Sequence, residues 1–284
     1  MPERRVLVTG GRGQLAAEFA PLVAPDACLS ASRDELDVSD ADAVSRAIEQ
    51  FRPTLVIHAA AWTNVDGAET DRDGAYAVNE RGSRNVARAA RAVGASLVAY
   101  STDYVFPGDA PGGYRESDAT GPRSVYGASK LAGEVAVREE HPDAYVVRTA
   151  WVFGPRGQNF VRTMLRLGSE RDELRVVDDQ RGSPTYTRDL AEATLRLVDA
   201  CPPGTYHLAG AGACSWFELA EAIMRRAGLD ARVVPITSAE LDRPAPRPAC
   251  SILHSEHACT PTLPPWEAGL DACLHELSQQ EVPS

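Results

Sequence analysis

The hydrophobic pattern of the first 150 residues alternates between short apolar runs and longer amphipathic stretches. The apolar runs predict strands at residues 5–9, 27–32, 55–58, 96–101 and 145–148. Between them, amphipathic stretches predict helices at residues 14–23, 41–51, 76–93 and 125–140. Strands that alternate with helices need crossover connections, and such crossovers are right-handed. The pattern therefore predicts an α/β fold built on a doubly wound parallel sheet.

The alternation loosens after residue 150, although helical patterns continue at residues 160–167, 188–198 and 216–227. Proline becomes denser, and residues 241–248 are expected to be extended and rich in turns. We expect a first domain over residues 1–155, to which a strand and helix near residues 185–209 return. A smaller mixed domain is expected over residues 156–284.

Composition and charge exclude several classes of protein. Hydrophobic residues make up 44% and charged residues 24%, which are ordinary globular values. No run approaches the about 20 apolar residues of a membrane span, and the net charge of -11 disfavours binding to nucleic acid or to an anionic membrane. The N-terminus leaves no room for a signal peptide before the first strand. We therefore expect a cytoplasmic protein whose six cysteines are reduced thiols.

A glycine-rich turn joins the first predicted strand to the first predicted helix. Gly10, Gly13 and Ala16 follow the strand at three-residue spacing. Glycine lets the backbone turn tightly and approach a pyrophosphate, whose charge then rests at the start of the helix. Ordinary strand-to-helix turns can carry the same pattern, but its place at the first crossover favours a dinucleotide site.

The end of the second predicted strand indicates which dinucleotide binds. An acidic residue there would hold a ribose 2′-hydroxyl. The chain instead has Ser32 and Arg33, and no acid before Asp34. A hydroxyl and a guanidinium suit a 2′-phosphate better, so we expect NADPH as the preferred cofactor, with NADH as the alternative. The competing interpretation is that Arg33 simply faces solvent.

The most specific pattern is the pair Tyr126 and Lys130, which lie at i, i+4 in a predicted helix and share a face. Lys130 is the single lysine among 29 basic residues. A neighbouring ammonium favours the phenolate form of tyrosine and brings its pKa down from about 10 toward the working range. Thr102 stands at the end of the fourth predicted strand. These groups predict proton transfer to or from a bound substrate.

These motifs resemble the extended short-chain dehydrogenase/reductase family. Longer segments at residues 59–69, 101–106, 148–154 and 179–185 narrow the resemblance to one branch. They are similar to the dTDP-4-dehydrorhamnose reductase family, and the similarity extends to about Pro248. The resemblance implies a Rossmann-type dinucleotide-binding domain in the first half and a substrate-binding domain in the second.

The resemblance also implies a role for each matching residue. Tyr126 would donate a proton to a ketone oxygen, Lys130 would lower the pKa of Tyr126 and hold the nicotinamide ribose, and Thr102 would hydrogen-bond the ketone oxygen and supply or relay a proton. The expected cofactor-binding residues are Gly10, Gly13, Gln14, Leu15, Ser32, Arg33, Asp37, Val38, Ala60, Ala61, Trp62, Thr63, Tyr126 and Lys130. The expected substrate-binding residues are Thr102, Asp103 and Trp151.

The implied reaction is reduction by NAD(P)H of the C4 ketone of a dTDP-4-dehydro-6-deoxy-L-hexose, with dTDP-L-rhamnose as the archetypal product. A dihydrostreptose synthase or another deoxysugar 4-ketoreductase would keep the same residues. A dehydratase needs Asp-Glu where this chain has Asp103 and Tyr104, and an epimerase usually has an acidic ribose anchor, which is absent at Ser32. Tyr126 and Lys130 argue against a non-catalytic regulatory subunit of the same fold.

Other expectations concern metals and assembly. The resemblance alone suggests a homodimer and Mg²⁺ at an interface between subunits. The tail after Pro248 departs from the family pattern. Its residues Cys250, His254, His257 and Cys259 could be read as zinc ligands, but their spacing does not match a standard finger, so we expect no metal there.

Overall fold

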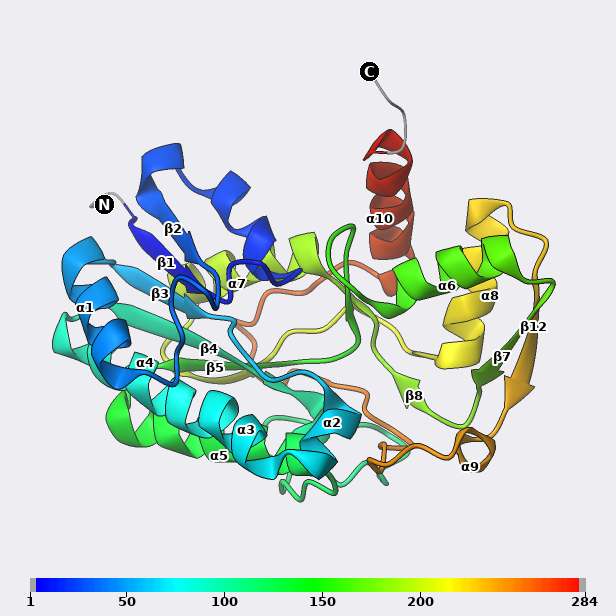
Figure 1. Cartoon of the computed structure of the whole chain (residues 1–284), viewed down its shortest axis with the longest axis horizontal. Helices are drawn as coiled ribbons and strands as arrows, with labels where there is room; N and C mark the ends of the chain where they lie inside the picture. The colour runs from blue at the N-terminus through cyan, green and yellow to red at the C-terminus, as the bar shows by residue number, and fades with distance from the viewer. Residues whose placement is uncertain (1–3, 281–284) are drawn as a thin grey trace.

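The computed structural model describes residues 4–280 (Figure 1). Its strands are β1 (Val6–Thr9), β2 (Cys28–Ala31), β3 (Leu55–His58), β4 (Ser96–Thr102), β5 (Tyr145–Thr149), β6 (Val152–Phe153), β7 (Glu173–Val177), β8 (Arg181–Gly182), β9 (Thr185–Tyr186), β10 (Gly204–His207), β11 (Cys214–Ser215) and β12 (Arg232–Ile236). Its α-helices are α1 (Ala41–Phe51), α2 (Val65–Thr70), α3 (Arg72–Tyr76), α4 (Ser83–Ala92), α5 (Val125–Glu140), α6 (Phe160–Glu170), α7 (Thr187–Ala200), α8 (Trp216–Ala227), α9 (Ser238–Leu241) and α10 (Trp266–Gln280). Shorter helical segments are η1 (Ala16–Glu18), η2 (Ala20–Leu22), η3 (Pro25–Ala27), η4 (Ala77–Gly82) and η5 (Asp103–Val105).

Six strands form a parallel sheet in the order β10-β5-β4-β3-β1-β2. Val6 of β1 lies beside Cys28 of β2 on one side and Leu55 of β3 on the other. The strands β1, β3 and β5 are buried along their whole length, as expected of parallel strands covered on both faces. This topology confirms the predicted α/β doubly wound fold.

Helices cover both faces of this sheet. Successive side chains of a strand point to opposite faces, so Leu7 packs in one apolar cluster with Ile48 of α1, and Val8 in another with Leu190 of α7. In Figure 1, α1, α4 and α5 lie on one side of the sheet and α7 on the other. The cores on both faces hold the carboxyl ends of the strands in fixed positions.

A third apolar cluster lies beside the sheet and includes residues of α6, α8 and α10. It contains Met164, Leu219 and Leu270, and three two-stranded pairings lie around it: β6 with β9, β8 with β11, and β7 with β12. Figure 1 shows these elements grouped beyond the ends of β4 and β5. The predicted domain boundary near residue 155 stays a prediction. The return of β10 to the large sheet supports the part of it that concerns residues 185–209.

Two predicted helices differ from the structure. Residues 14–23 do not form an α-helix: η1 and η2 are 3₁₀ segments, in which the amide of Phe19 bonds the Ala16 carbonyl three residues earlier. Pro21 has no amide hydrogen with which to continue a ladder of i to i−4 bonds. Residues 76–93 are helical, but the π-helical segment η4 separates α3 from α4. No helix within residues 4–280 is long and apolar enough to cross a bilayer.

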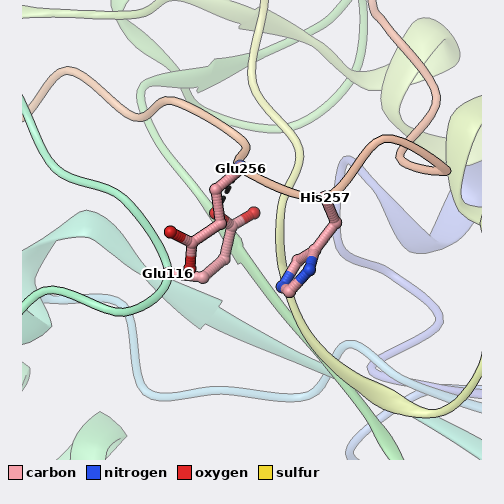
Figure 2. Close-up of side chains that lie close together, drawn as sticks. All are labelled: Glu116, Glu256 and His257. Atoms are coloured by element: carbon pink, nitrogen blue, oxygen red, sulfur yellow. Dashed lines mark hydrogen bonds between the residues drawn. The ribbon is translucent and has the colours of Figure 1, made fainter.

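The tail is attached to the large sheet by a carboxylate. Glu116 accepts hydrogen bonds from the amide of His207 at the end of β10 (2.8 Å) and from the amide of Glu256 (2.9 Å). Figure 2 shows Glu116, Glu256 and His257 close together. The Glu116 carboxylate therefore holds the tail against β10. His254 instead bonds the Gly112 carbonyl.

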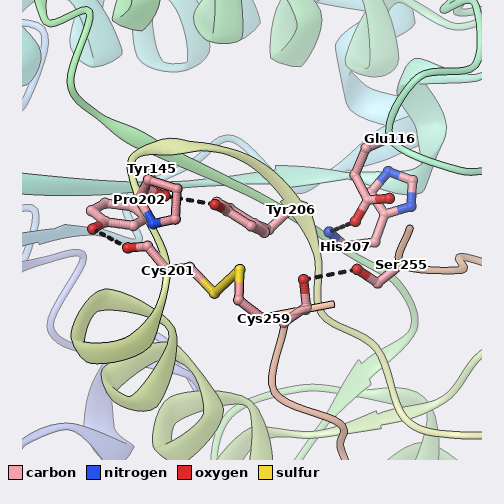
Figure 3. Close-up of a disulfide and its surroundings, with 9 residues drawn as sticks. Glu116, Tyr145, Cys201, Pro202, Tyr206, His207, Ser255 and Cys259 are labelled. Carbon is pink, nitrogen blue, oxygen red and sulfur yellow. Dashed lines mark hydrogen bonds between the residues drawn. A yellow bond between two sulfur atoms is a disulfide. The ribbon is translucent and has the colours of Figure 1, made fainter. Parts of the chain in front are cut away.

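A disulfide makes a further attachment. Cys201, directly after α7, is bonded to Cys259 of the tail, with 5.6 Å between their Cα atoms (Figure 3). The other four cysteines, Cys28, Cys214, Cys250 and Cys273, are free. The expectation that all six are reduced thiols was therefore wrong. Cys201 and Cys259 are 58 residues apart in the sequence. No pattern in the sequence indicates that the fold brings these two cysteines together. The disulfide also removes Cys259 from the set of zinc ligands that we considered.

Candidate active site

The glycine turn after β1 depends on the absence of side chains. Gly10 has a φ of 75°, and a Cβ atom there would lie 2.8 Å from the Cα of Ala60. At Gly11 a Cβ would lie 2.7 Å from the Ser30 hydroxyl. The turn closes with a bond from the Gly13 amide to the Gly10 carbonyl (2.7 Å). The Gly11 amide bonds the Ala31 carbonyl (2.8 Å), so the turn is also tied to the end of β2. Only the short 3₁₀ segment η1 follows the turn, and the full α-helix expected there is missing.

Gln14 and Leu15 lie just beyond this turn. The Gln14 side-chain amide donates to the Val152 carbonyl (3.1 Å) and accepts from Asn159 (3.2 Å). Leu15 packs at the margin of the apolar cluster on the α7 face of the sheet. Gln14 thus connects the glycine turn to β6 and to the start of α6.

The end of β2 differs in part from the sequence expectation. The Ser32 hydroxyl donates to Glu35 (2.7 Å), and the Ser32 amide bonds the same carboxylate oxygen (2.8 Å). This hydroxyl is therefore already engaged within the turn. Arg33 is exposed, and its charge helps to lower the pKa of Asp37, although hydrogen bonds from Ser39 contribute more. Of the two predicted phosphate-binding residues, Arg33 is the one whose side chain faces outward.

The loop after β3 is positioned by Asn79, a residue that sequence reasoning missed. Asn79 lies in the π-helical segment η4 and is 1% exposed. Its side-chain oxygen, Oδ1, accepts from the Trp62 amide (2.8 Å). Its side-chain NH₂ group donates to the Trp62 carbonyl (3.2 Å) and to the Ser129 hydroxyl (2.9 Å). Ser129 in turn donates to the Tyr126 carbonyl (2.8 Å). One buried amide therefore connects the predicted loop of Ala60, Ala61, Trp62 and Thr63 to the turn that carries Tyr126.

A second buried network supports the same loop. His58, at the end of β3, bonds Thr9 of β1 (2.8 Å) and Ser83 of α4 (3.1 Å). The Thr9 hydroxyl also accepts from the Ala60 amide (3.2 Å). Burial, with a smaller effect of the charge on Lys130, lowers the pKa of His58 to about 3, so the ring is neutral. His58 is a structural group that joins three elements.

Tyr126 lies in the first turn of α5, near Thr102 at the end of β4. Ser124 caps the helix by accepting from the Gly127 amide (3.1 Å). Burial raises the pKa of Tyr126 to about 12, while a hydrogen bond with Thr102 partly offsets that rise. The phenol is therefore protonated near neutral pH, as an acid must be. The edge of the Tyr104 ring packs against it, with 5.5 Å between centroids.

Lys130 lies in the next turn of α5 and is 6% exposed. Its ammonium donates to the Tyr100 carbonyl of β4 (2.7 Å). Burial lowers its pKa to about 8, although the charge on Glu134 raises it. Lys130 is not among the groups that set the pKa of Tyr126, so the expected lowering of that pKa is not found in this structure.

Asp103 follows Thr102 and is buried. The Thr102 hydroxyl donates to one Asp103 oxygen, Oδ1 (2.8 Å). The other oxygen, Oδ2, is buried and has no hydrogen-bond partner within residues 4–280. Burial raises the pKa of Asp103 to about 6, and the nearby Ser251 and Thr102 hydroxyls limit that rise. The side chains of Tyr126, Thr102 and Asp103 therefore form a row of polar groups at the end of β4.

Trp151 lies in a backbone conformation that is uncommon for a bulky residue, with a φ of 47°. Its ring stacks on Trp216, with 3.5 Å between centroids and an angle of 4°. Gly182 lies so close to the same ring that a Cβ atom there would overlap it. The indole N–H donates to the Ser251 hydroxyl (3.2 Å). The sequence did not indicate that Trp151 would contact Trp216, Gly182 and Ser251.

The chain matches a known family over nearly all of its described length. Residues 4–279 match the family described as RmlD substrate binding domain. The chain belongs to this family. It is 46% identical over 281 residues to a dTDP-4-dehydrorhamnose reductase of Streptomyces griseus, with 95% of this chain and 92% of that protein covered.

Two further proteins resemble this RmlD family member over nearly its whole length. A crystal structure of the dTDP-4-dehydrorhamnose reductase of Bacillus anthracis in complex with NADP has a TM-score of 0.93 and 42% identity, over 96% of this chain and 99% of that one. A probable dTDP-4,6-dihydroxy-2-methyloxan-3-one 4-ketoreductase of Streptomyces antibioticus is 39% identical over 289 residues, with 98% and 97% covered. The resemblance to the dTDP-4-dehydrorhamnose reductase family is therefore confirmed.

Two cavities of this RmlD family chain lie away from the predicted catalytic residues. One of about 1110 Å³ lies between α6, α8 and α10, and is lined by residues that include Arg162 and Leu274. Another of about 470 Å³ is lined by residues 209–213 and by parts of the tail. Neither contains a predicted catalytic residue. The candidate active site therefore rests on the row of polar side chains along β4 and α5.

Proposed function

We propose that this chain reduces the C4 ketone of dTDP-4-dehydro-L-rhamnose with NADPH, giving dTDP-L-rhamnose. The row of Tyr126, Thr102 and Asp103 beside Lys130 carries the proposal, in a chain 46% identical to a dTDP-4-dehydrorhamnose reductase. A reduction of this kind needs a hydride donor, an acid and a site that orients the ketone.

Each of these residues has a separate task. NADPH, when bound, supplies the hydride. Tyr126, protonated because of its raised pKa, gives its proton to the ketone oxygen, and Thr102 hydrogen-bonds the same oxygen. Lys130, kept mostly charged at pH 7, donates to the hydroxyls of the nicotinamide ribose. Asp103 and Trp151 contact the sugar and orient its ring.

The proposal that NADPH is preferred over NADH is supported by the exposed guanidinium of Arg33 and by the absence of an acid at the end of β2. Changing Arg33 to alanine should weaken NADPH binding by about tenfold and leave NADH binding unchanged, because only NADPH carries the 2′-phosphate. Titration of both cofactors by protein fluorescence tests this, with Arg46→Ala on α1 as the control. Equal losses for both cofactors would contradict it.

A related substrate is the second candidate. The 39% identity to a probable deoxysugar 4-ketoreductase supports it, since such an enzyme could use the same catalytic row. Supplying dTDP-4-dehydro-L-rhamnose with NADPH or NADH and identifying the hexose by NMR separates the two candidates. Formation of dTDP-L-rhamnose supports the first. Failure to consume NADPH with this ketone would overturn it in favour of a different 4-ketosugar.

The proposal extends to assembly and location, where family resemblance is the only support. We infer a homodimer, which light scattering tests, and Mg²⁺ at its interface, which metal analysis of the purified protein tests. We also infer a cytoplasmic location. The Cys201–Cys259 disulfide is unusual for a reducing compartment, so counting free thiols in protein trapped by alkylation inside the cell tests this inference directly.

A further inference from the structure

The tail from residue 249 to residue 254 runs between the two parts of the molecule. The Cys250 amide bonds the Gly108 carbonyl (3.0 Å), in the segment that follows β4. The next amide, that of Ser251, bonds the Arg181 carbonyl of β8 (2.8 Å). The backbone of Ser251 is therefore fixed on both sides, and its side chain has little freedom to move.

The Ser251 hydroxyl lies between two predicted sugar-binding residues. Ser251 is 1% exposed, and its oxygen accepts from the indole N–H of Trp151 (3.2 Å). The same side chain lies near the Asp103 carboxyl and limits the rise in the pKa of that group, although no hydrogen bond joins the two. A serine hydroxyl carries one donor as well as its acceptor lone pairs. Since the bond from Trp151 uses an acceptor position, the hydroxyl proton is available to Asp103.

One oxygen of the Asp103 carboxyl lacks a hydrogen-bond donor in the described part of the chain. Its Oδ1 atom already accepts from Thr102, whereas Oδ2 is buried without a hydrogen-bond partner within residues 4–280. A buried carboxylate oxygen without a donor is destabilising. A bond from Ser251 would satisfy this oxygen without disturbing Thr102.

Trp151 needs more than stacking to stay in place. Its left-handed backbone conformation is unfavourable for a bulky residue and persists only where the surroundings impose it. Trp216 fixes the plane of the ring, and Gly182 leaves room for it. Stacking alone allows the ring to slide within that plane, but a hydrogen bond at the indole nitrogen fixes its position along it.

We propose that Ser251 is a positioning residue that couples Trp151 to Asp103 and so sets the geometry of the sugar-binding subsite. This inference rests on the proposed function, because Trp151 and Asp103 are taken to contact the sugar of a dTDP-sugar. Ser251 contacts neither cofactor nor the reacting ketone. It acts on the reaction through the two residues that it joins.

The test replaces Ser251 with alanine in the full chain and measures binding of dTDP-L-rhamnose to the NADP-loaded protein by calorimetry. We expect the affinity for the dTDP-sugar to fall by about 5- to 20-fold, as loss of a buried hydrogen bond predicts. In steady-state assays the KM for the ketosugar should rise similarly, with kcat within about threefold and the KM for NADPH unchanged. The matched control is Ser255→Ala, which removes a tail hydroxyl bonded only to Thr260 and should bind as the wild type does.

A double-mutant cycle with Trp151→Phe tests whether Ser251 acts through Trp151. Phenylalanine lacks the indole N–H, so Ser251→Ala should weaken binding less in that background than in the wild type. Full additivity would contradict the coupling to Trp151. An unchanged dTDP-sugar affinity in a folded Ser251→Ala variant, or equal losses for NADPH and the dTDP-sugar, would overturn the proposal.

Loss of folding in the variant and loss of binding in the wild-type protein each have a defined meaning for the proposal. If circular dichroism shows that Ser251→Ala does not fold, Ser251→Cys keeps the volume with a weaker donor, and wild-type affinity in that variant would overturn the inference. If the wild-type protein itself fails to bind dTDP-L-rhamnose, the proposed function fails, and this inference fails with it. Wild-type binding with no effect at Ser251 overturns this inference alone.

Discussion

At the scale of single residues, burial and hydrogen bonding act in opposite directions on the phenol of Tyr126. Burial raises its pKa, and Thr102 lowers it, with a result of about 12. The spacing of Tyr126 and Lys130 was enough to predict that both lie on one face of α5. It could not predict that the Lys130 ammonium would bond the Tyr100 carbonyl, because that contact depends on how closely α5 approaches β4.

Replacing Tyr126 with phenylalanine removes the proposed acid and little else. Turnover should fall by about 10²- to 10⁴-fold, while the affinity for NADPH stays the same, because the ring still packs against Tyr104. Stopped-flow measurement of NADPH oxidation and a cofactor titration check this. Tyr76→Phe on α3 serves as the control and should retain activity. Near-normal turnover in Tyr126→Phe would show that another group is the acid.

The pH dependence should report Lys130 rather than Tyr126. The pKa of Lys130 is lowered from its ordinary value to about 8, so its charge is present below that pH and is lost as the pH rises through it. The phenol, with a pKa of about 12, keeps its proton over the same range. We expect kcat/KM to decline above about pH 8 in a profile from pH 6 to pH 10. A flat profile to pH 10 would mean that the charge on Lys130 is not needed.

At the scale of elements, the accuracy of the sequence prediction followed the clarity of the local pattern. The strands β1, β3 and β5 were predictable because each contains a run of apolar residues, as expected of strands whose two faces are covered. The α-helix expected at residues 14–23 was wrong, because the prediction relied on the apolar spacing and gave too little weight to Pro21. The π-helical segment η4 was also missed, since a π-helix has no distinct hydrophobic period.

The segment η4 has a testable role. Asn79→Ala removes the amide that holds Trp62 and Ser129, and leaves the Trp62 amide without its partner. We expect a loss of about 1–3 kcal/mol in the free energy of unfolding, together with weaker NADPH binding, because the loop after β3 would loosen. Urea unfolding and cofactor titration measure both effects. Gln180→Ala, which removes another buried side-chain amide that bonds only Ser238 within residues 4–280, should leave NADPH binding unchanged, and equal effects on cofactor binding in the two variants would refute the role given to Asn79.

At the scale of the whole molecule, contacts between distant parts of the chain were the least predictable. Ser251 reaches Trp151 across 100 residues, and Cys201 reaches Cys259 across 58. No periodicity or motif carries such information. The fold and the residues of the catalytic row followed from motifs within single segments, whereas the sugar subsite depends on where the tail returns.

The disulfide should contribute to stability by limiting the unfolded chain. Removing it with the double change Cys201→Ser and Cys259→Ser should lower the free energy of unfolding by about 2–4 kcal/mol. Urea unfolding under non-reducing conditions measures the difference. Cys28→Ser, which changes a free thiol, is the control. If the double variant unfolds at the same urea concentration as the wild type, the cross-link makes no net contribution.

The place of the tail has a consequence for the order in which the enzyme becomes complete during its synthesis. The cofactor turn, the loop after β3, Thr102, Tyr126 and Lys130 all leave the ribosome within the first 130 residues. The strand β10 and the tail, which bonds β8 and the segment after β4, follow more than 70 residues later. A nascent chain could therefore hold a dinucleotide well before its sugar subsite exists.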